Sequence, residues 1–347
     1  MAMFSVALIG AGHIGRTRLA VIRDCHKSVL RAVVDVDLPR AEELAAKAGG
    51  EASSDWRRIV TRQDVDIVIV STPTKFHSEI ATASLHAGKH VLCEKPLGRT
   101  TEEAQKVVDA ALDSGCILKT GLNYRYMAHV RKAKQLLDDG ALGPVYFLRC
   151  RYGHGGRPGY ERVWCTDKEL SGGGVLLEQG IHIFDLVRHF LGEPNAVSAE
   201  IRRYFWNFDS VEDNCFSTVE TPCGQLAQLQ VSWTQWVNIF EVEIFGRDGY
   251  LRLEGRDGHY GRQRLICGKR KQDHSRPEET VFEFGPVDES WKLEWSDFLR
   301  SVEVTRDLGG ALFDGLRAQQ MVDAAYESAE RRTWINIPSL QVQLVGD

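Results

Sequence analysis

The stretch FSVALIGAGHIG, residues 4–15, joins an apolar run directly to the glycine pattern G-x-G-x-x-G. This order predicts a strand, a tight turn and a helix, which together open a βαβ unit. In that unit Gly10 permits the sharp turn, Gly12 lets a pyrophosphate approach the backbone, and Gly15 lets helix and strand pack closely. The N-terminus of the helix then faces the negative charge of the phosphates. The stretch therefore predicts a dinucleotide site, and the alternative is a tight turn that binds nothing.

A carboxylate follows the next predicted strand at the distance that ribose recognition requires. Asp35 stands at the end of a strand expected over 30–36, about 20 residues after Gly15. A carboxylate there accepts hydrogen bonds from the ribose hydroxyls and repels a 2′-phosphate. Because Val36 and Asp37 come next, and not an arginine, the pattern favours NAD over NADP. The alternative role of Asp35 is helix capping, which Asp37 suits better.

Strand and helix signals alternate over the first third of the chain. The run IVIV, residues 67–70, is typical of a strand covered on both faces, and the alternation predicts a doubly wound parallel sheet. After Pro194 strands follow one another without helices, which predicts an open, mostly antiparallel sheet. The expected fold class is thus α/β followed by α+β. A Rossmann domain spans residues 1–122, and an α+β domain for substrate binding and oligomerisation spans 123–347. Its closing helix, over 311–331, packs back toward the Rossmann domain.

Hydrophobic periodicity supplies the expected element boundaries. Helices are expected over residues 13–24, 76–87, 101–114, 126–139, 175–191, 290–304 and 311–331. One further helix is expected to begin at Pro39. Strands are expected over 4–9, 30–36, 67–70, 89–93, 116–121, 145–152, 197–206, 214–221, 225–233, 239–246, 249–254 and 279–284.

The composition excludes several classes of function. The 347 residues carry a net charge of −5, from 43 basic and 48 acidic side chains, so no basic surface for nucleic acid is expected. No apolar run approaches the roughly 20 residues that span a bilayer, and the N-terminus has no basic segment or cleavage site. The eight cysteines form no Cys-x-x-Cys pair, so neither a metal site nor a disulfide framework is expected. We therefore expect a cytoplasmic protein with reduced thiols, no membrane anchor and no nucleic-acid partner.

The motif Glu94-Lys95-Pro96 ends a strand expected over 89–93. Ligands of open α/β sheets bind outside the carboxyl ends of the strands, which places Lys95 near the nicotinamide. Its ammonium can donate to an alcohol or carbonyl oxygen and stabilise the charge that develops there. Pro96 shapes the turn and is a candidate for a cis peptide bond. The alternative is a lysine at a strand end that pairs with Glu94.

The helix expected over 175–191 carries one polar stripe on an otherwise apolar surface. Glu178, His182, Asp185 and His189 recur in it at helical spacing. His182 is the candidate general acid or base, because the ordinary pKa of histidine lies near neutral pH. Glu178, one turn earlier, would orient His182, balance its charge or bind substrate hydroxyls. The alternative is a solvated surface pair, and the spacing is not that of a zinc motif.

A glycine-rich loop over 153–171 carries aromatic and charged residues without a clear periodic pattern. Tyr160 and Trp164 would stack on the face of a sugar, and Arg157 would clamp a carboxylate or phosphate. The flanking glycines would let the loop close over a ligand. If Arg157 binds an anion, uronic or nucleotide-linked sugars become candidate substrates. The alternative is a surface loop whose aromatic residues pack inward.

Taken together, the motifs resemble one family over nearly the whole chain. In chain order they are Gly10 to Gly15, Asp35, Thr72-Pro73 with His77, Glu94-Lys95-Pro96, and Gly172-Gly173-Gly174 leading to Gly180-Ile181-His182. In combination they are similar to the glucose–fructose oxidoreductase / inositol dehydrogenase / rhizopine-catabolism family. The similarity extends to the closing segment from Trp334 to Pro338.

The resemblance implies a cofactor site and a catalytic pair. It places these residues among those that bind the dinucleotide: Gly10, Gly12, His13, Ile14, Gly15, Asp35, Thr72, Pro73, His77, Glu94 and Lys95. It implies that Lys95 holds the reacting oxygen and that His182 relays its proton. Asn123 and Arg125 match the segment between the domains, where cofactor and substrate contacts cluster. Many family dehydrogenases have Asp at the position of Glu178, and the longer side chain would shift the substrate or draw the carboxylate away.

The expected function is therefore an NAD-dependent oxidoreductase. It would transfer a hydride between a secondary hydroxyl of a sugar, sugar acid or inositol and the nicotinamide, with Lys95 polarising the oxygen and His182 relaying the proton. The resemblance also implies a homodimer or homotetramer joined through the C-terminal sheet. Two alternatives stay open, namely an NAD-dependent glycoside hydrolase that uses transient oxidation and a non-catalytic regulator that binds dinucleotide.

Overall fold

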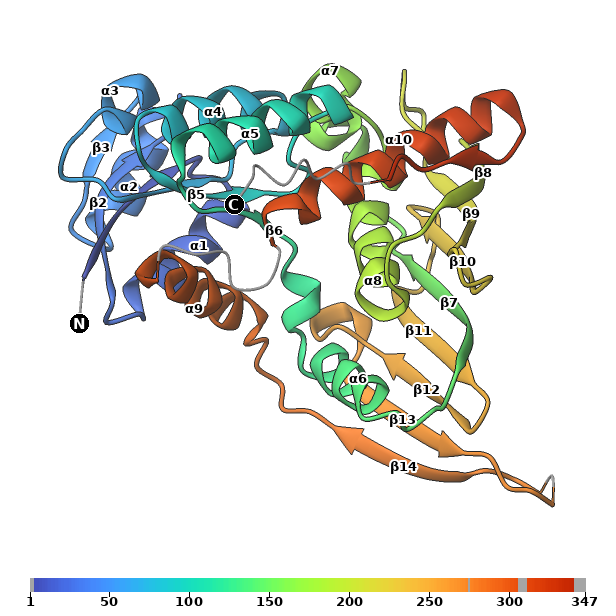
Figure 1. The fold of residues 1–347 in the computed structure, drawn as a ribbon. Coiled ribbons are helices and arrows are strands. Elements are labelled where there is room, and N and C mark those ends of the chain that lie inside the picture. The colour runs from blue at the N-terminus through green and yellow to red at the C-terminus, as the bar shows by residue number, and fades with distance from the viewer. Residues whose placement is uncertain (1–2, 274, 305–310, 340–347) are drawn as a thin grey trace.

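The structure, a computed structural model, describes residues 3–273, 275–304 and 311–339 (Figure 1). The described residues form two sheets with helices packed against them, which confirms the expected fold class. The domain boundary at residue 122 stays a prediction, and the outermost ends of the two expected domains lie outside the described residues. No described helix is both long enough and apolar enough to cross a membrane.

The N-terminal sheet is parallel, with strand order β3-β2-β1-β4-β5-β6. Its strands are β1 (Phe4–Ile9), β2 (Ser28–Val34), β3 (Glu51–Ser53), β4 (Ile67–Val70), β5 (His90–Glu94) and β6 (Leu118–Gly121). Its helices are α1 (His13–Arg23), α2 (Leu38–Ala46), α3 (Trp56–Val60), α4 (His77–His86) and α5 (Thr101–Ser114). The strand order turns between β1 and β4, and ligands of open α/β sheets bind at such a point.

Helices cover both faces of this sheet, which explains the uninterrupted β-branched sequence of β4. On one face α3, α4 and α5 pack on a core that includes Val70 and Val91. On the other face α1 and α2 pack on Ile69 together with Trp295 of α9 (Ser290–Glu303). Because α9 comes late in the chain, a distant segment completes the cover of the N-terminal sheet (Figure 1).

The carboxyl ends of three neighbouring strands meet at one edge of the sheet. Ile9 of β1 pairs with Val70 of β4, which in turn pairs with Cys93 of β5. The glycine turn, the Thr72-Pro73 turn and Lys95 follow these strands directly. The parallel register therefore brings three separate motifs to one edge.

The second sheet is antiparallel except for the β7–β10 pair, and its strand order is β14-β13-β12-β11-β7-β10-β9-β8-β15. Its strands are β7 (Val145–Gly153), β8 (Ala196–Arg202), β9 (Asn214–Glu220), β10 (Leu226–Ser232), β11 (Ile239–Gly246), β12 (Gly249–Glu254), β13 (Arg264–Lys269), β14 (Glu278–Glu283) and β15 (Ile335–Asn336). The sequence analysis missed β3, α3, β13 and β15, and also the helix over Lys168–Ser171, which it took as part of a loop; all are elements of six residues or fewer.

One face of the second sheet is covered and the other is open. The helices of this half are α6 (Ala128–Asp138), α7 (Lys168–Ser171), α8 (Ile181–Leu191) and α10 (Asp314–Arg331). The apolar core lies between the sheet and α6, α8 and α10. The helix α10 also reaches α5 and β6 of the N-terminal half, so it contacts both sheets (Figure 1).

Candidate active site

The glycine turn after β1 has the shape that a dinucleotide requires. Gly10 has a φ of +103°, which glycine adopts without strain. A Cβ at Gly10 would lie 2.4 Å from a carbonyl oxygen just after β4, and one at Gly15 would lie 2.0 Å from the carbonyl oxygen of Gly10. At Gly12 such a Cβ would meet no atom within 4 Å, so the backbone there is open to a ligand. Exposed His13 and half-buried Ile14 follow at the start of α1.

Asp35 lies directly after β2, beside this turn. Its Oδ2 accepts a hydrogen bond of 2.8 Å from the backbone N–H of Ala11, which holds the carboxylate against the glycines. Asp37 caps α2 by accepting from the backbone N–H of Arg40, which confirms the capping role expected for it. The turn and the carboxylate together fit the pyrophosphate and ribose of a dinucleotide.

His77 contacts the backbone of two neighbouring turns. Its Nδ1 lies 2.7 Å from the carbonyl oxygen of Pro96, and its Nε2 lies 2.8 Å from the carbonyl oxygen of Thr72. Burial lowers the pKa of His77 below its ordinary value. Both ring nitrogens thus face carbonyl oxygens, and the single N–H of the neutral imidazole donates to one of them. His77 therefore positions the half-buried Thr72-Pro73 turn instead of offering a free donor to a cofactor.

Glu94 is buried and belongs to an ion triad. Arg18 of α1 lies 2.6 Å from Glu94 and, through its other terminal nitrogen, 2.6 Å from Glu294 of α9. Burial raises the pKa of Glu294, and the charge of Arg18 opposes that effect. The triad ties the helix of the glycine turn to β5 and to the C-terminal half, so Glu94 acts on the cofactor site through the position of α1.

Lys95 joins the two halves of the molecule. Its Nζ donates to the backbone carbonyl oxygen of Glu178 at 2.7 Å and lies 3.1 Å from Oε1 of the same residue. The pairing of Lys95 with Glu94 that we held as an alternative is not formed. An ammonium has three N–H donors, so one remains for a ligand. The peptide bond between Lys95 and Pro96 is cis.

Glu178 lies in a π-helical segment, Leu176–Gly180, that leads into α8. The sequence predicted one regular helix here, and the wider turn is a local departure of a kind that recurs at functional sites. A Cβ at Gly180 would meet the side chain of Leu176 at 3.0 Å and that of Val231 at 3.5 Å. The close neighbours of this glycine are therefore two apolar side chains, one from its own segment and one from β10.

His182 is buried in α8, with its ring stacked on Tyr124. The two ring centroids are 3.8 Å apart and the planes differ by 3°. Burial, reinforced by the positive charges of Lys95 and Arg256, holds the pKa of His182 well below its ordinary value. The imidazole is consequently neutral near pH 7, the state in which histidine accepts a proton.

The loop over 153–171 meets the site through Tyr160 and Cys165. The hydroxyl and the thiol of these residues are hydrogen-bonded, and the charge of Glu178 acts on both. Burial, together with Glu178, raises the pKa of Cys165 to about 12, so the thiol stays protonated. Trp164 and Arg157, expected to bind substrate, are solvent-exposed, and Arg157 makes no ion pair with any described residue.

Asn123 and Arg125 make hydrogen bonds to residues much later in the chain. Asn123 donates to Oγ of Ser290 at 2.9 Å. Arg125 donates to Asp185 and to Asp314, each at 2.7 Å. These donors are occupied, so the structure does not bring Asn123 and Arg125 together with Lys95 and His182 as free groups.

Sequence reasoning missed three residues beside His182. Tyr124 and Tyr152, both buried, join their hydroxyls at 2.6 Å, and Arg256 donates to the Tyr124 hydroxyl. Tyr124 lies between Asn123 and Arg125, which the sequence analysis singled out, but no role was assigned to it. Arg256 follows β12 in a turn-like sequence that gave no signal. No group of His, Cys, Asp and Glu within the described part of the chain could hold a metal ion.

Two family models match the chain. One, described as the oxidoreductase family with an NAD-binding Rossmann fold, matches residues 4–122, and the other, described as the GFO/IDH/MocA C-terminal domain, matches residues 130–252.

Curated proteins and solved structures agree with these matches. A levoglucosan dehydrogenase of Pseudarthrobacter phenanthrenivorans is 27% identical over 98% of this chain and 100% of its own length. A D-glucoside 3-dehydrogenase of Escherichia coli is 32% identical over 69% of this chain and 72% of its own length. A levoglucosan dehydrogenase structure with NADH and levoglucosan superposes with a TM-score of 0.87 at 26% identity, covering 97% of this chain and 100% of that one.

Proposed function

The chain belongs to the GFO/IDH/MocA family of NAD-binding oxidoreductases, as its motifs predicted, and we propose that it reversibly oxidises a secondary hydroxyl of a sugar, sugar acid or inositol. The observation that carries this proposal is the convergence of Lys95, from the N-terminal sheet, with Glu178 and His182, from the second half. Relatives that are named as dehydrogenases of levoglucosan and of D-glucosides support the substrate class.

The residues that would hold NAD lie at the edge of the N-terminal sheet where the carboxyl ends of β1, β4 and β5 meet. Gly10, Gly12 and Gly15 form the pyrophosphate turn, and Asp35 would receive the ribose hydroxyls. When bound, NAD supplies the acceptor for the hydride of the substrate carbon. Thr72 and Pro73 also lie at this edge, and the contact of His77 Nε2 with the carbonyl oxygen of Thr72 positions them.

Lys95 would orient the substrate oxygen and stabilise negative charge on it. Two of its donors face Glu178, and the third is available to the hydroxyl of the sugar. The Glu178 carboxylate balances the charge of the ammonium, which lets a cation persist at a half-buried position.

His182 would take the proton of the hydroxyl. Its Nδ1 is enclosed and has no hydrogen-bond partner among the described residues, so we assign the transfer to Nε2. Stacking on Tyr124 fixes the plane of the ring. The low pKa of His182 keeps it ready to accept a proton, and the resulting imidazolium is acidic enough to return it in the reductive direction.

Measuring NADH absorbance with NAD and a panel of sugars, sugar acids and inositols tests the proposal. Lys95→Met and His182→Ala should each lower kcat/KM by about 100- to 10,000-fold. Lys106→Met, which removes an exposed lysine from α5, is the matched control and should leave the rate unchanged. Wild-type rates in both site variants would refute the assigned roles.

The same assay separates the two other functions considered. Cleavage of a glycoside without net NADH would indicate a hydrolase that uses transient oxidation. Calorimetric binding of NAD with no turnover on the whole panel would indicate a regulator.

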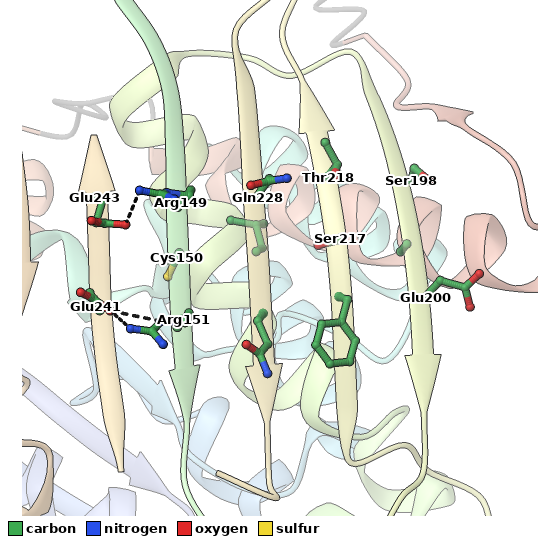
Figure 2. A pocket seen from close by; sticks show the side chains of 14 residues that line it. Arg149, Cys150, Arg151, Ser198, Glu200, Ser217, Thr218, Gln228, Glu241 and Glu243 are labelled. Carbon is green, nitrogen blue, oxygen red and sulfur yellow. Dashed lines mark hydrogen bonds and ion pairs between the residues drawn. The ribbon is translucent and has the colours of Figure 1, made fainter. Parts of the chain in front are cut away.

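We also propose that the chain forms a homo-oligomer through the open face of the second sheet. Figure 2 shows this face as a shallow hollow across β8, β9, β10, β7 and β11. Arg149 pairs with Glu243 at 3.0 Å, Arg151 pairs with Glu241, and Phe216 stands 40% exposed. Phe216→Glu should convert the oligomer to a smaller species in light scattering coupled to size exclusion. A monomeric wild-type protein would overturn this proposal.

A further inference from the structure

Arg256 differs from the other buried and half-buried arginines of the described chain, because no carboxylate pairs with it. The buried or largely buried Arg18, Arg125, Arg188 and Arg317 all make ion pairs. So do the other half-buried arginines of the described chain, Arg62, Arg99, Arg252 and Arg264. An unpaired cation away from water is unfavourable, so its presence requires an explanation.

Aromatic rings surround the guanidinium instead. The guanidinium carbon lies 4.7 Å from the ring centroid of Tyr260, 5.2 Å from that of Tyr124 and 5.7 Å from that of Tyr152. Ring faces attract a cation and offset part of its lost hydration. The rings carry no net charge, however, so the positive charge of Arg256 is not neutralised.

Arg256 also keeps unused hydrogen-bond donors. Its Nη1 donates to the hydroxyl of Tyr124, while Nε is enclosed without a partner in the described structure. Its Nη2 is neither enclosed nor bonded to any described residue. A guanidinium offers its donors as a planar fork that matches the two oxygens of a carboxylate or phosphate.

This arginine lies beside the catalytic candidates. The Tyr124 ring that it contacts is the one on which His182 stacks. Burial lowers the pKa of His182, and the positive charge of Arg256 contributes to that shift. Burial also lowers the pKa of His154, to about 4, and the charges of Arg256 and Arg157 contribute there. The charge of Lys95 is balanced by Glu178, so Arg256 leaves the surroundings of His182 with an excess of positive charge.

We propose that Arg256 binds an anionic group, a carboxylate or a phosphate, carried by the sugar that this site oxidises. The inference rests on the proposed function and narrows its substrate class from sugars in general to charged sugars. Arg157 was the arginine that the sequence singled out for this role. It lies exposed near His154, where it adds to the positive field at the rim.

Matched pairs of sugars test the inference. The wild-type protein with NAD is assayed on D-glucose against D-glucuronate, D-galactose against D-galacturonate, and D-glucose against D-glucose 6-phosphate. We expect kcat/KM for at least one charged member to exceed that of its neutral partner by about 10- to 100-fold. Whether the acids or the phosphate show the larger factor identifies the group that is recognised.

Substitutions locate the preference at Arg256. Arg256→Met should abolish the preference, so that the ratio of kcat/KM for the charged sugar to that for its neutral partner falls to about one, whereas a purely structural role would lower both members of a pair equally and leave the ratio unchanged. Arg256→Lys keeps the charge and should retain part of the preference. Arg252→Met, on β12 and paired with Glu254, is the control and should retain all of it. If Arg256→Met does not fold, Arg256→Lys and the loss of preference on raising NaCl from about 50 to 500 mM test the same point.

The outcomes separate this inference from the function on which it rests. Equal rates on charged and neutral sugars overturn the inference and leave the proposed function standing. If the wild-type protein oxidises no sugar, the proposed function fails, and calorimetric titration of glucuronate and glucose 6-phosphate decides the inference. Binding that is lost in Arg256→Met then supports the anion site, and absence of binding overturns it.

Discussion

At the joint between the two halves the buried Arg18 meets carboxylates, whereas beside His182 Arg256 meets only tyrosine rings and a phenol oxygen. In this joint Arg18 bridges Glu94 and Glu294, and within the second half Arg125 likewise bridges Asp185 and Asp314. These cations thus have carboxylate partners at distances below 3 Å.

The difference between the two regions lies in what each can still bind. The charges of the joint are paired within the protein, so the joint holds α1, β5 and α9 in one arrangement. The site retains one donor on Lys95, a neutral imidazole on His182 and open donors on Arg256. We therefore expect substitutions in the joint to lower stability, and substitutions in the site to lower activity with little change in stability.

The largest expected effect is on the joint. Arg18→Met removes a fully buried cation and leaves two carboxylates facing each other, which should cost about 3–5 kcal/mol in the free energy of unfolding measured by urea. Arg16→Met, in the exposed pair with Glu43, is the matched control and should leave that free energy almost unchanged, because solvent screens an exposed pair. Equal stability of both variants would remove the contrast between joint and site.

A smaller effect is expected where the two halves touch in the site. Glu178→Gln preserves size and removes the charge that balances Lys95, so kcat/KM should fall by about 10- to 100-fold, or about 1.4–2.7 kcal/mol. The pair is 15% and 24% exposed, and the unfolding free energy should change by no more than about 1 kcal/mol. Glu178→Asp restores the charge and should recover most of the rate. A stability loss without a rate loss would place Glu178 in the joint.

The smallest expected effect is a shift in pH dependence. A cation near His182 disfavours the imidazolium, so removal of Arg256 should raise the pKa of His182. The proton-accepting form would then be lost at a higher pH, and the acidic limb of log kcat/KM on a neutral sugar should move up by about 0.5–1 unit in Arg256→Met. Arg256→Lys keeps the charge and should leave the limb in place. An unmoved limb in Arg256→Met would show that its charge does not reach His182.

Much of the fold was predictable because it rests on local patterns. The helix over 101–114 was placed at its observed bounds, since its cap and its apolar spacing lie within one segment. The π-helical turn before His182 was not predictable, because it departs from the regular helical period and lies among strands that are distant in sequence. The cover of the N-terminal sheet by α9 was likewise out of reach, since Trp295 is nearly 300 residues from β1.

The candidate site was predictable in part for the same reason. Motifs identified Lys95, His182 and the glycine turn, because each carries its chemistry in a few adjacent residues. The roles of Arg125 and Glu94 were different from those expected, since their carboxylate or guanidinium partners are 60 or more residues away. Arg256 could not be found, because a turn residue shows nothing of the three rings that surround it.

Order along the chain was thus enough to establish the nucleotide fold and the family and to single out candidates for the reacting groups, since glycine turns, strand ends and helical spacing are properties of neighbouring residues. Only the tertiary structure determined which charges are neutralised by a partner of opposite sign. Electrostatic pairing depends on distances across space, and it is this pairing that neutralises the charge of Arg18 in the joint and leaves that of Arg256 without a carboxylate.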